Sequence, residues 1–475
     1  MKNCDFLIIG SGPAGQKAAI QGAKAGLDVV LIESEKTIGG MCVHKGTIPS
    51  KALRESAKRF NSAHRLLKSD IPTELAPLMQ NVDLVVDAHD KYISAQLVRN
   101  NIDTYIGRAS FVNSSTVKVR QSGGESQLFK AKNIFIATGS KPRHPPNIEI
   151  DHEYILDSDS ILAMNYLPTS MIVLGGGVIA CEYASVFQSL GTNVTLLDRF
   201  EAPLGFLDHD LSKRFVLDFE KKGGRFIGSK NLKRASFDGL SEVSVELDDG
   251  SEVRAEKLLV AQGRISNIDG LNITAAGVNV TDLKLISADE NCQTNVPHIY
   301  AVGDVIGPPS LASTSMEQGR RAACHALNFG KNKMNDIIPM GIWTIPELAS
   351  VGLNEKDARQ EYGEPLIGYA EFKEIARGLI AGTDEGVLKI ISDPSGEKIV
   401  GVHIAGEGAA ELIHLGQTAI LNGTNVKSFV EQIFNFPTFA EAYRVAALSI
   451  SGQVAQRNAA SCVNPRLQAS HRHVS

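Results

Sequence analysis

Short apolar runs that alternate with helical patterns organise the first part of the 475-residue chain. The first run spans Asp5 to Ile9, and a helical pattern follows from about Ala14 to Ala25. A further apolar run from Asp28 to Ile32 comes next. Continuous apolar runs are typical of strands buried in a parallel sheet, and strands that alternate with helices indicate β-α-β units. The pattern therefore predicts an α/β fold.

The turn between the first strand and the first helix is rich in glycine. Gly10, Gly12 and Gly15 have the G-x-G-x-x-G spacing, and the second strand ends on Glu33. Such a turn lets a pyrophosphate approach the helix N-terminus, and the acid hydrogen-bonds a ribose hydroxyl. A chance glycine-rich turn would lack the surrounding strand, helix and acid, so this segment predicts a dinucleotide site.

A second unit repeats this arrangement after the strand Met171 to Leu174. Its acid follows its first glycine at the same offset as in the first unit, and alanine is allowed at the third glycine position. Two equivalent units predict two dinucleotide sites. The matching positions of the second unit are Gly175, Gly177, Ala180 and Asp198.

Length and composition narrow the class of protein. The chain is too long for one hydrophobic core, and its formal charge of −5 gives no reason to expect nucleic acid as a partner. No apolar run is long enough for a membrane span, and from the early start of the first strand we expect no signal peptide. The six cysteines are scattered without a C-x-x-C pair. This usage favours a reducing cytoplasm and argues against a zinc site.

The segment Gly39 to Arg54 reads GGMCVHKGTIPSKALR. It resembles the active-site segment of the flavoprotein pyridine nucleotide–disulfide oxidoreductases, such as lipoamide dehydrogenase and glutathione reductase. In that family two cysteines five positions apart form a redox disulfide beside FAD. Cys42 occupies the first position here, but Thr47 occupies the second. A hydroxyl cannot cycle between thiolate and disulfide.

The resemblance implies two Rossmann-like domains, for FAD and NAD(P), and a C-terminal α+β dimerisation domain. From about Ile337 the pattern changes to alternating strands with later helices, which fits that last domain. We therefore expect a homodimer or a larger homo-oligomer. The implied boundaries are residues 1–150 and 269–336 for the two parts of the FAD-binding domain, 151–268 for the NAD(P)-binding domain, 337–450 for the dimerisation domain and 451–475 for a flexible tail.

The resemblance also implies functional residues. Lys51 and Glu182 occupy the positions of a lysine–glutamate pair near the flavin's hydride-accepting nitrogen, where their charges would assist hydride transfer. The alternative is that both are ordinary residues of helix surfaces. The cofactor-binding positions implied are Gly10, Gly12, Pro13, Gly15, Glu33, Gly40, Cys42, Thr47, Lys51, Thr138, Gly139, Gly175, Gly177, Asp198, Arg199, Gly263, Asp304 and Ala312; no metal ligand is expected.

The C-terminal signature FNFPTFAE departs from the family pattern. The disulfide enzymes place a histidine immediately before its proline, and a glutamate orients that histidine. Glu441 is present here, but Phe436 stands at the histidine position. Phenylalanine has no titratable proton and cannot act as an acid–base catalyst.

The segment GTIPSKALR and the tail FNFPTFAEAYRVAAL together closely resemble the soluble pyridine nucleotide transhydrogenases. This implies FAD-dependent hydride transfer between NADPH and NAD in a ping-pong scheme. Asp198 would favour a free ribose hydroxyl and Arg199 a 2′-phosphate, and the sequence does not tell which side chain faces the ribose. Two alternatives stay open: an NAD(P)H:quinone reductase or diaphorase, and a dihydrolipoamide dehydrogenase-like homologue kept as a non-catalytic subunit.

Overall fold

The computed structural model describes residues 1–67, 73–330, 336–383 and 385–469. The chain divides into two compact units. Unit 1 comprises residues 1–175, 190–192 and 232–335, and unit 2 comprises residues 176–189, 193–231 and 336–475. The division passes through the predicted NAD(P)-binding domain, and the domain boundaries expected from the sequence stay predictions.

The main sheet of unit 1 has the strand order β3-β2-β1-β6-β5-β4, with β17 paired to β6. β1 is buried on both faces, because Leu7 and Ile9 lie in one hydrophobic cluster and Phe6 and Ile8 lie in another. This explains its continuous apolar run. The strands are β1 (Lys2–Ile9), β2 (Val29–Glu33), β3 (Asp103–Ile106), β4 (Arg108–Asn113), β5 (Thr116–Arg120), β6 (Ser126–Ile136) and β17 (Ile299–Ala301).

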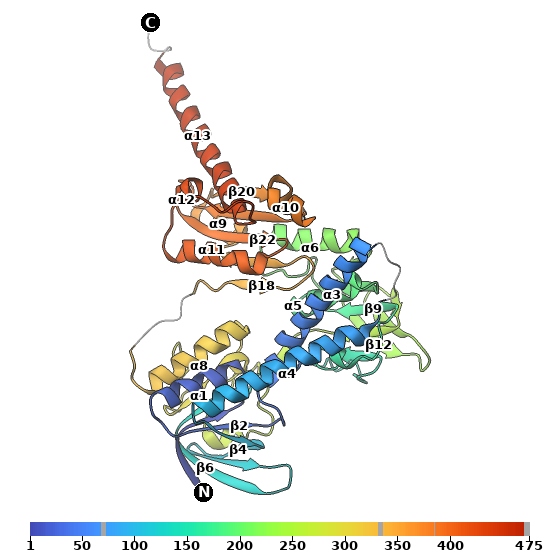
Figure 1. Cartoon of the computed structure of the whole chain (residues 1–475), viewed down its shortest axis with the longest axis vertical. Coiled ribbons are helices and arrows are strands. Elements are labelled where there is room, and N and C mark those ends of the chain that lie inside the picture. The colour runs from blue at the N-terminus through green and yellow to red at the C-terminus, as the bar shows by residue number, and fades with distance from the viewer. Residues whose placement is uncertain (68–72, 331–335, 384, 470–475) are drawn as a thin grey trace. The chain divides into compact units, whose positions relative to one another are not determined.

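Helices α1 (Pro13–Lys24) and α8 (Ala312–Ala326) lie side by side (Figure 1). A Cβ atom added at Gly319 would lie 2.0 Å from the carbonyl oxygen of Ala14. The two backbones therefore touch, and only glycine fits at this point of α8.

Helices α2 (Gly40–His44), α3 (Thr47–Leu67) and α4 (Leu75–Arg99) follow β2 along the chain. The pattern of residues 68–82 predicts a proline-broken surface insertion, and this prediction is wrong from Leu75 onward. Pro77 lies in the first turn of α4, where proline costs no intrahelical hydrogen bond. Residues 68–72 lie outside the described residues.

Unit 1 also holds three smaller strand groups. Strands β8, β9 and β15 pair in parallel, β12, β13 and β14 are antiparallel, and β7 pairs with β16. Their bounds are β7 (Ser140–Pro142), β8 (Ile155–Asp157), β9 (Ser170–Leu174), β12 (Leu232–Phe237), β13 (Val243–Leu247), β14 (Glu252–Ala255), β15 (Lys257–Val260) and β16 (Arg264–Ser266), with helix α7 (Ile273–Ala276).

Unit 2 contains the parallel pair β10–β11 and an antiparallel sheet of order β18-β19-β22-β21-β20. Helices α11 and α13 pack against this sheet. The elements are α5 (Val178–Ser189), β10 (Asn193–Leu197), α6 (His209–Lys221), β11 (Arg225–Ile227), β18 (Met340–Ile342), β19 (Leu348–Gly352), α9 (Glu355–Tyr362), β20 (Leu366–Glu371), α10 (Ala376–Ala381), β21 (Val387–Ser392), β22 (Ile399–Ala405), α11 (Ala409–Leu421), α12 (Val426–Glu431) and α13 (Glu441–Ala469).

The C-terminal segment differs from its sequence prediction. We expected a loose tail from residue 451, but α13 continues to Ala469. Alanine, glutamine and arginine are frequent in this segment and favour helix even where the surface is polar. Residues 470–475 lie outside the described residues. None of the helices that the structure describes has the length and apolarity needed to cross a bilayer.

Candidate functional site

The first glycine turn has the geometry that its spacing predicts. Gly10 has φ +106°, and a Cβ atom there would lie 2.3 Å from the carbonyl oxygen of Ala137. A Cβ atom at Gly15 would lie 1.9 Å from the carbonyl oxygen of Gly10. At Gly12, in contrast, no described atom lies within 4 Å of the Cβ position. Two glycines thus fold the turn, and the third leaves open space at the N-terminus of α1, where a pyrophosphate fits.

Glu33 closes this turn from the end of β2. Its carboxylate is buried and accepts hydrogen bonds from the backbone amide of Ser11, at 3.0 Å, and from the Ser11 hydroxyl, at 2.5 Å. The Ser11 hydroxyl also accepts a bond from the amide of Gly39, at 2.8 Å. Gly40 has φ +64°, and its Cβ position lies 2.9 Å from the Cα of Gly12. The turn, the acid and the start of α2 therefore form one structure, and Ser11 is a member that the sequence analysis missed.

Thr138 follows the carboxyl end of β6, next to Gly10. Its hydroxyl oxygen is buried and has no hydrogen-bond partner among the described residues. A buried hydroxyl without a partner is costly, so one that persists points to a missing ligand. The residue beside it, Gly139, has φ +68° and open space at its Cβ position. This pair fits a flavin dinucleotide, as the resemblance implied.

Asp304 lies just after β17, and a chain of hydrogen bonds holds it. Its carboxylate accepts a bond from the Ser140 hydroxyl at 2.7 Å, and that hydroxyl accepts one from Arg264 Nε at 2.8 Å. Arg264 also donates to the carbonyl oxygen of Ser140 at 2.8 Å. The sequence analysis assigned Gly263 and Asp304 but missed Ser140 and Arg264. The links span more than 120 positions of sequence, and no local pattern announces them.

Cys42, Thr47 and Lys51 lie together on α2 and α3. Burial raises the pKa of the Cys42 thiol, and neither the neighbouring Thr47 side chain nor the nearby charge of Lys51 offsets this shift. The thiolate is the reactive form of cysteine. Cys42 is therefore an unactivated thiol whose side-chain neighbour is a hydroxyl.

The second glycine turn follows the same steric rules as the first. Gly175 has φ +122°, and a Cβ atom there would lie 2.5 Å from the carbonyl oxygen of Ala261. At Gly177 no described atom lies within 4 Å of the Cβ position. The turn is tight at its first glycine and open at its second, as at Gly10 and Gly12.

Asp198 ends β10, and its carboxylate points at the second turn. A Cβ atom added at Gly176 would lie 2.1 Å from Asp198 Oδ2, and Asp198 Oδ1 accepts a bond from the Arg199 amide at 2.8 Å. Burial raises the pKa of this carboxyl group. The guanidinium of Arg199 is exposed and stacks on the Phe200 ring, 4.7 Å from its centroid. Asp198 thus faces the glycine turn, and Arg199 lies at the solvent side.

The remaining predicted residues lie as follows. Glu182 is buried on α5, and its Oε1 accepts a bond from the Trp343 amide at 2.9 Å. Lys51 belongs to unit 1 and Glu182 to unit 2, so their pairing stays a prediction. Phe436 is exposed, and Glu441 accepts a bond from the Thr438 amide at 3.3 Å. This glutamate therefore binds the loop just before α13, and no histidine precedes the proline for it to orient.

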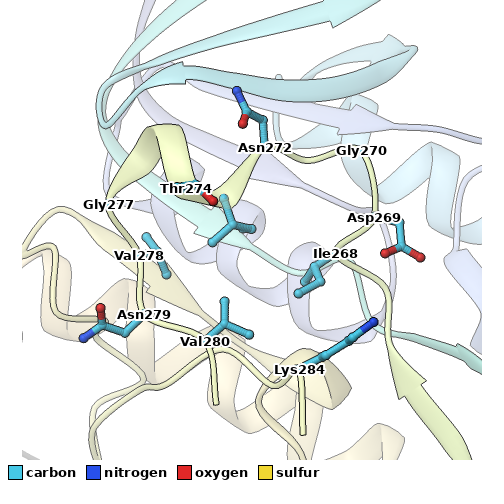
Figure 2. Close-up of a pocket in the computed structure, with 11 residues that line it drawn as sticks. Ile268, Asp269, Gly270, Asn272, Thr274, Gly277, Val278, Asn279, Val280 and Lys284 are labelled. Atoms are coloured by element: carbon cyan, nitrogen blue, oxygen red, sulfur yellow. The ribbon is translucent and has the colours of Figure 1, made fainter. Parts of the chain in front are cut away.

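A separate pocket of ≈ 670 Å³ lies elsewhere in unit 1 (Figure 2). Residues between Ile268 and Lys284 line it, including Asn272 and Thr274 of the segment around α7. None of the predicted cofactor-binding or catalytic residues lies in its wall. The dinucleotide turns, and not this pocket, therefore define the candidate site.

Models of known protein families match most of this chain, including both glycine turns. The sequence model of the family described as "Pyridine nucleotide-disulphide oxidoreductase" matches residues 4–319, and that of its dimerisation domain matches residues 338–447. The chain belongs to the pyridine nucleotide-disulphide oxidoreductase family. The α/β fold and the C-terminal dimerisation domain expected from the sequence are confirmed.

Two relatives within this oxidoreductase family are named soluble pyridine nucleotide transhydrogenase. The protein of Vibrio atlanticus is 40% identical over 94% of this chain and 97% of its own length. The protein of Pseudomonas entomophila is 39% identical over the same shares. Among solved structures, the flavoprotein disulfide reductase RclA of Escherichia coli superposes with a TM-score of 0.87 at 26% identity, over 94% of this chain and 99% of that one.

Proposed function

We propose that this protein is a transhydrogenase that passes hydride between NADPH and NAD with the help of FAD. The observation that carries the proposal is that Thr47 lies beside Cys42, where a disulfide reductase needs a second thiol. Without that thiol, and without a histidine at Phe436, electrons have no dithiol outlet. A second nicotinamide is then the natural acceptor. The names of the full-length relatives support this reading.

The residues of unit 1 suit FAD. The open space at Gly12 would take the pyrophosphate, Glu33 the ribose, and Asp304 the ribityl chain. The orphaned Thr138 hydroxyl supports the assignment, because a bound dinucleotide would supply its missing partner. Bound FAD supplies a two-electron acceptor and donor that a nicotinamide can reduce or oxidise.

The turn Gly175–Gly177 would hold the nicotinamide dinucleotide. Asp198 faces this turn and suits the ribose of NAD, while the exposed Arg199 suits the 2′-phosphate of NADPH. The two residues together would let one site accept both coenzymes in turn. The proposed roles of Lys51 and Glu182 are to order the charge around the hydride-transfer position.

We further propose that the protein works in the cytoplasm as a homodimer. The match to a dimerisation domain and the names of its soluble relatives support this assignment. The cysteines whose side chains the structure describes are free, which fits a reducing compartment; they are Cys4, Cys42, Cys181, Cys292 and Cys324.

Anaerobic titration of the purified yellow protein tests the proposed function. We expect NADPH to bleach the flavin absorbance, and NAD added afterwards to restore it with formation of NADH. Turnover with thio-NAD should be fast compared with turnover on lipoamide, glutathione or a quinone. A flavin that NADPH reduces but NAD cannot reoxidise, together with rapid quinone turnover, would overturn the proposal in favour of a quinone reductase.

A further inference from the structure

We propose that Lys389, with Asp208, Asp210 and Glu355, is a positioning cluster for the nicotinamide dinucleotide turn. Lys389 lies on β21 of the dimerisation domain, whereas Asp208 and Asp210 lie at the start of α6, which follows the dinucleotide unit. The inference builds on the proposed function, because it concerns the site that NADPH and NAD would share.

The lysine is buried beyond what its residue type normally tolerates. Its side chain is 1% exposed, and Nζ lies 2.9 Å from Asp208 Oδ1, 2.7 Å from Asp210 Oδ2 and 2.7 Å from Glu355 Oε2. A buried ammonium persists only where such partners compensate for its lost hydration. Although burial lowers the pKa of Lys389, the three carboxylates outweigh that effect and raise it, so the group is charged.

Asp208 connects this lysine to α6 and α9. It is 1% exposed, and its carboxylate accepts bonds from the Asp210 amide at 3.1 Å and the Glu355 amide at 2.9 Å. Asp208 is thus the N-cap of α6. Burial opposes ionisation of Asp208, but His403, the Glu355 amide and Lys389 together lower its pKa. The cluster therefore fixes the first turn of α6 to the C-terminal sheet.

The segment before α6 carries this restraint to the glycine turn. The Leu204 amide donates to the carbonyl oxygen of Gly176 at 2.7 Å, and a Cβ atom at Gly176 would lie 3.1 Å from the Cα of Pro203. The Ser212 hydroxyl of α6 donates to the carbonyl oxygen of Pro203. Pro203 and Leu204 thus pack against the middle of the turn, while Ser212 of α6 holds Pro203 on the other side.

Loss of the lysine would leave Asp208 buried without a counter-charge, beside two further carboxylates. Their mutual repulsion would displace the start of α6 and release Pro203 and Leu204 from Gly176. The turn would then bind a pyrophosphate less well, and by the same amount in the ground state and in the transition state of hydride transfer. Uniform loss of binding raises KM and leaves kcat unchanged. The FAD turn at Gly10 shares none of these residues.

The test compares Lys389→Met with wild type and with Lys427→Met, which removes an exposed lysine of the same domain. We expect Lys389→Met to raise KM for both NADPH and NADH by at least about fivefold, with kcat and FAD content within about twofold of wild type. Calorimetric titration with NADP and NAD should show the same loss of affinity. Lys389→Arg should recover part of it, because the charge returns.

A lowered melting temperature with unchanged KM and unchanged affinity for both nucleotides would show that the cluster is structural only and would overturn the proposal. If Lys389→Met does not fold, Asp208→Asn gives the same comparison, since asparagine can still cap α6 but carries no charge to pair with Lys389. The calorimetry also separates the two proposals. A wild type that binds both nucleotides but does not transfer hydride would refute the transhydrogenase proposal and leave the cluster's role to be decided by the variants.

Discussion

The side chains of Cys42 and Thr47 are neighbours, at the two positions where a disulfide reductase carries its redox pair. A hydroxyl cannot take part in thiol–disulfide exchange, so Thr47 gives Cys42 no redox partner. Burial also raises the pKa of the Cys42 thiol. The family scaffold is thus present, but its thiol chemistry is not.

Cys42 is expected to be dispensable for transhydrogenation. Cys42→Ser keeps a small polar side chain beside Thr47, so NADPH-to-thio-NAD turnover should stay within about twofold of wild type. Wild type should show negligible lipoamide or glutathione reductase activity. Loss of transhydrogenation in the serine variant, at normal FAD content, would assign Cys42 a role that the structure does not reveal.

Thr47→Cys is the matched gain-of-function variant. The two side chains are neighbours, so the new thiol should form a disulfide with Cys42 in air. Reduction of one disulfide takes two electrons and two protons. An anaerobic titration should therefore need one more equivalent of NADPH per subunit than wild type. An unchanged end point would show that the pair cannot adopt disulfide geometry.

The two open glycines give a direct test of both dinucleotide sites. No described atom lies within 4 Å of the Cβ position at Gly12 or Gly177, so alanine should not disturb the fold of the protein itself. A ligand that packs on these glycines would clash with the added methyl group. Gly12→Ala should weaken FAD binding at least about tenfold, or about 1.4 kcal/mol. Gly177→Ala should instead raise KM for NADPH and NADH and retain FAD.

Gly123→Ala is the control for both variants, because Gly123 also has open space but lies in a hairpin turn between β5 and β6. It should bind FAD and both nucleotides like wild type. Normal FAD affinity in Gly12→Ala would place the pyrophosphate elsewhere.

Arg199 and Asp198 are expected to set the balance between the two coenzymes. A hydrogen bond to a charged group contributes about 1.5–3 kcal/mol, so Arg199→Ala should weaken NADPH by about ten- to a hundredfold and affect NADH much less. Asp198→Asn should ease NADPH binding by removing like-charge repulsion. The measurement is the ratio of kcat/KM for NADPH and NADH, with Lys213→Ala of α6 as the exposed-cation control. A ratio that stays within about twofold in both variants would mean that other residues read the phosphate.

His403 is expected to make the protein less stable in mild acid. The ring is fully buried in unit 2, where it contacts the Ser350 hydroxyl at 2.8 Å and the carbonyl oxygen of Leu353 at 3.0 Å. Burial lowers its pKa below the ordinary value of 6.5. The unfolded chain therefore binds a proton first as the pH falls, and stability present above pH 6.5 is lost below it.

The free energy of unfolding should fall by at most about 1.4 kcal/mol per pH unit from this group. His403→Gln should remove that slope, whereas His414→Gln, at an exposed position of α11, should keep it. Urea midpoints at pH 7.5, 6.0 and 5.0 give the measurement. Equal slopes in wild type and His403→Gln would show that other groups dominate the acid response.

The sequence predicted both β-α-β units because their information is local. Each unit needs glycines where φ is positive or two backbones approach closely, and an acid where its second strand ends. All of these positions lie within some 25 residues of one another. In the structure the backbone approaches closely at Gly10 and Gly175, and the carboxylates of Glu33 and Asp198 lie against the two turns, as the local pattern predicts. Their ligands stay predictions.

Long-range partners could not be predicted in this way. Arg264 and Ser140 form their link to Asp304 only after the chain has folded. Lys389 did leave a signal, since a charged residue interrupts the apolar run of β21, and such a residue must find partners. Nothing in the sequence indicates that those partners are Asp208 and Glu355, which lie on other elements.

The pairing of β6 with β17 has a consequence for biosynthesis. Ile134 to Ile136 pair in register with Ile299 to Ala301, so one side of this end of β6 stays unpaired until about 160 more residues have been made. At about 5–20 residues per second, that interval lasts roughly 8 to 30 s on the ribosome. During this time the nascent chain carries an open apolar strand edge, which is a template for aggregation. Truncated products that end before β17 should therefore depend on chaperones far more than the complete chain does.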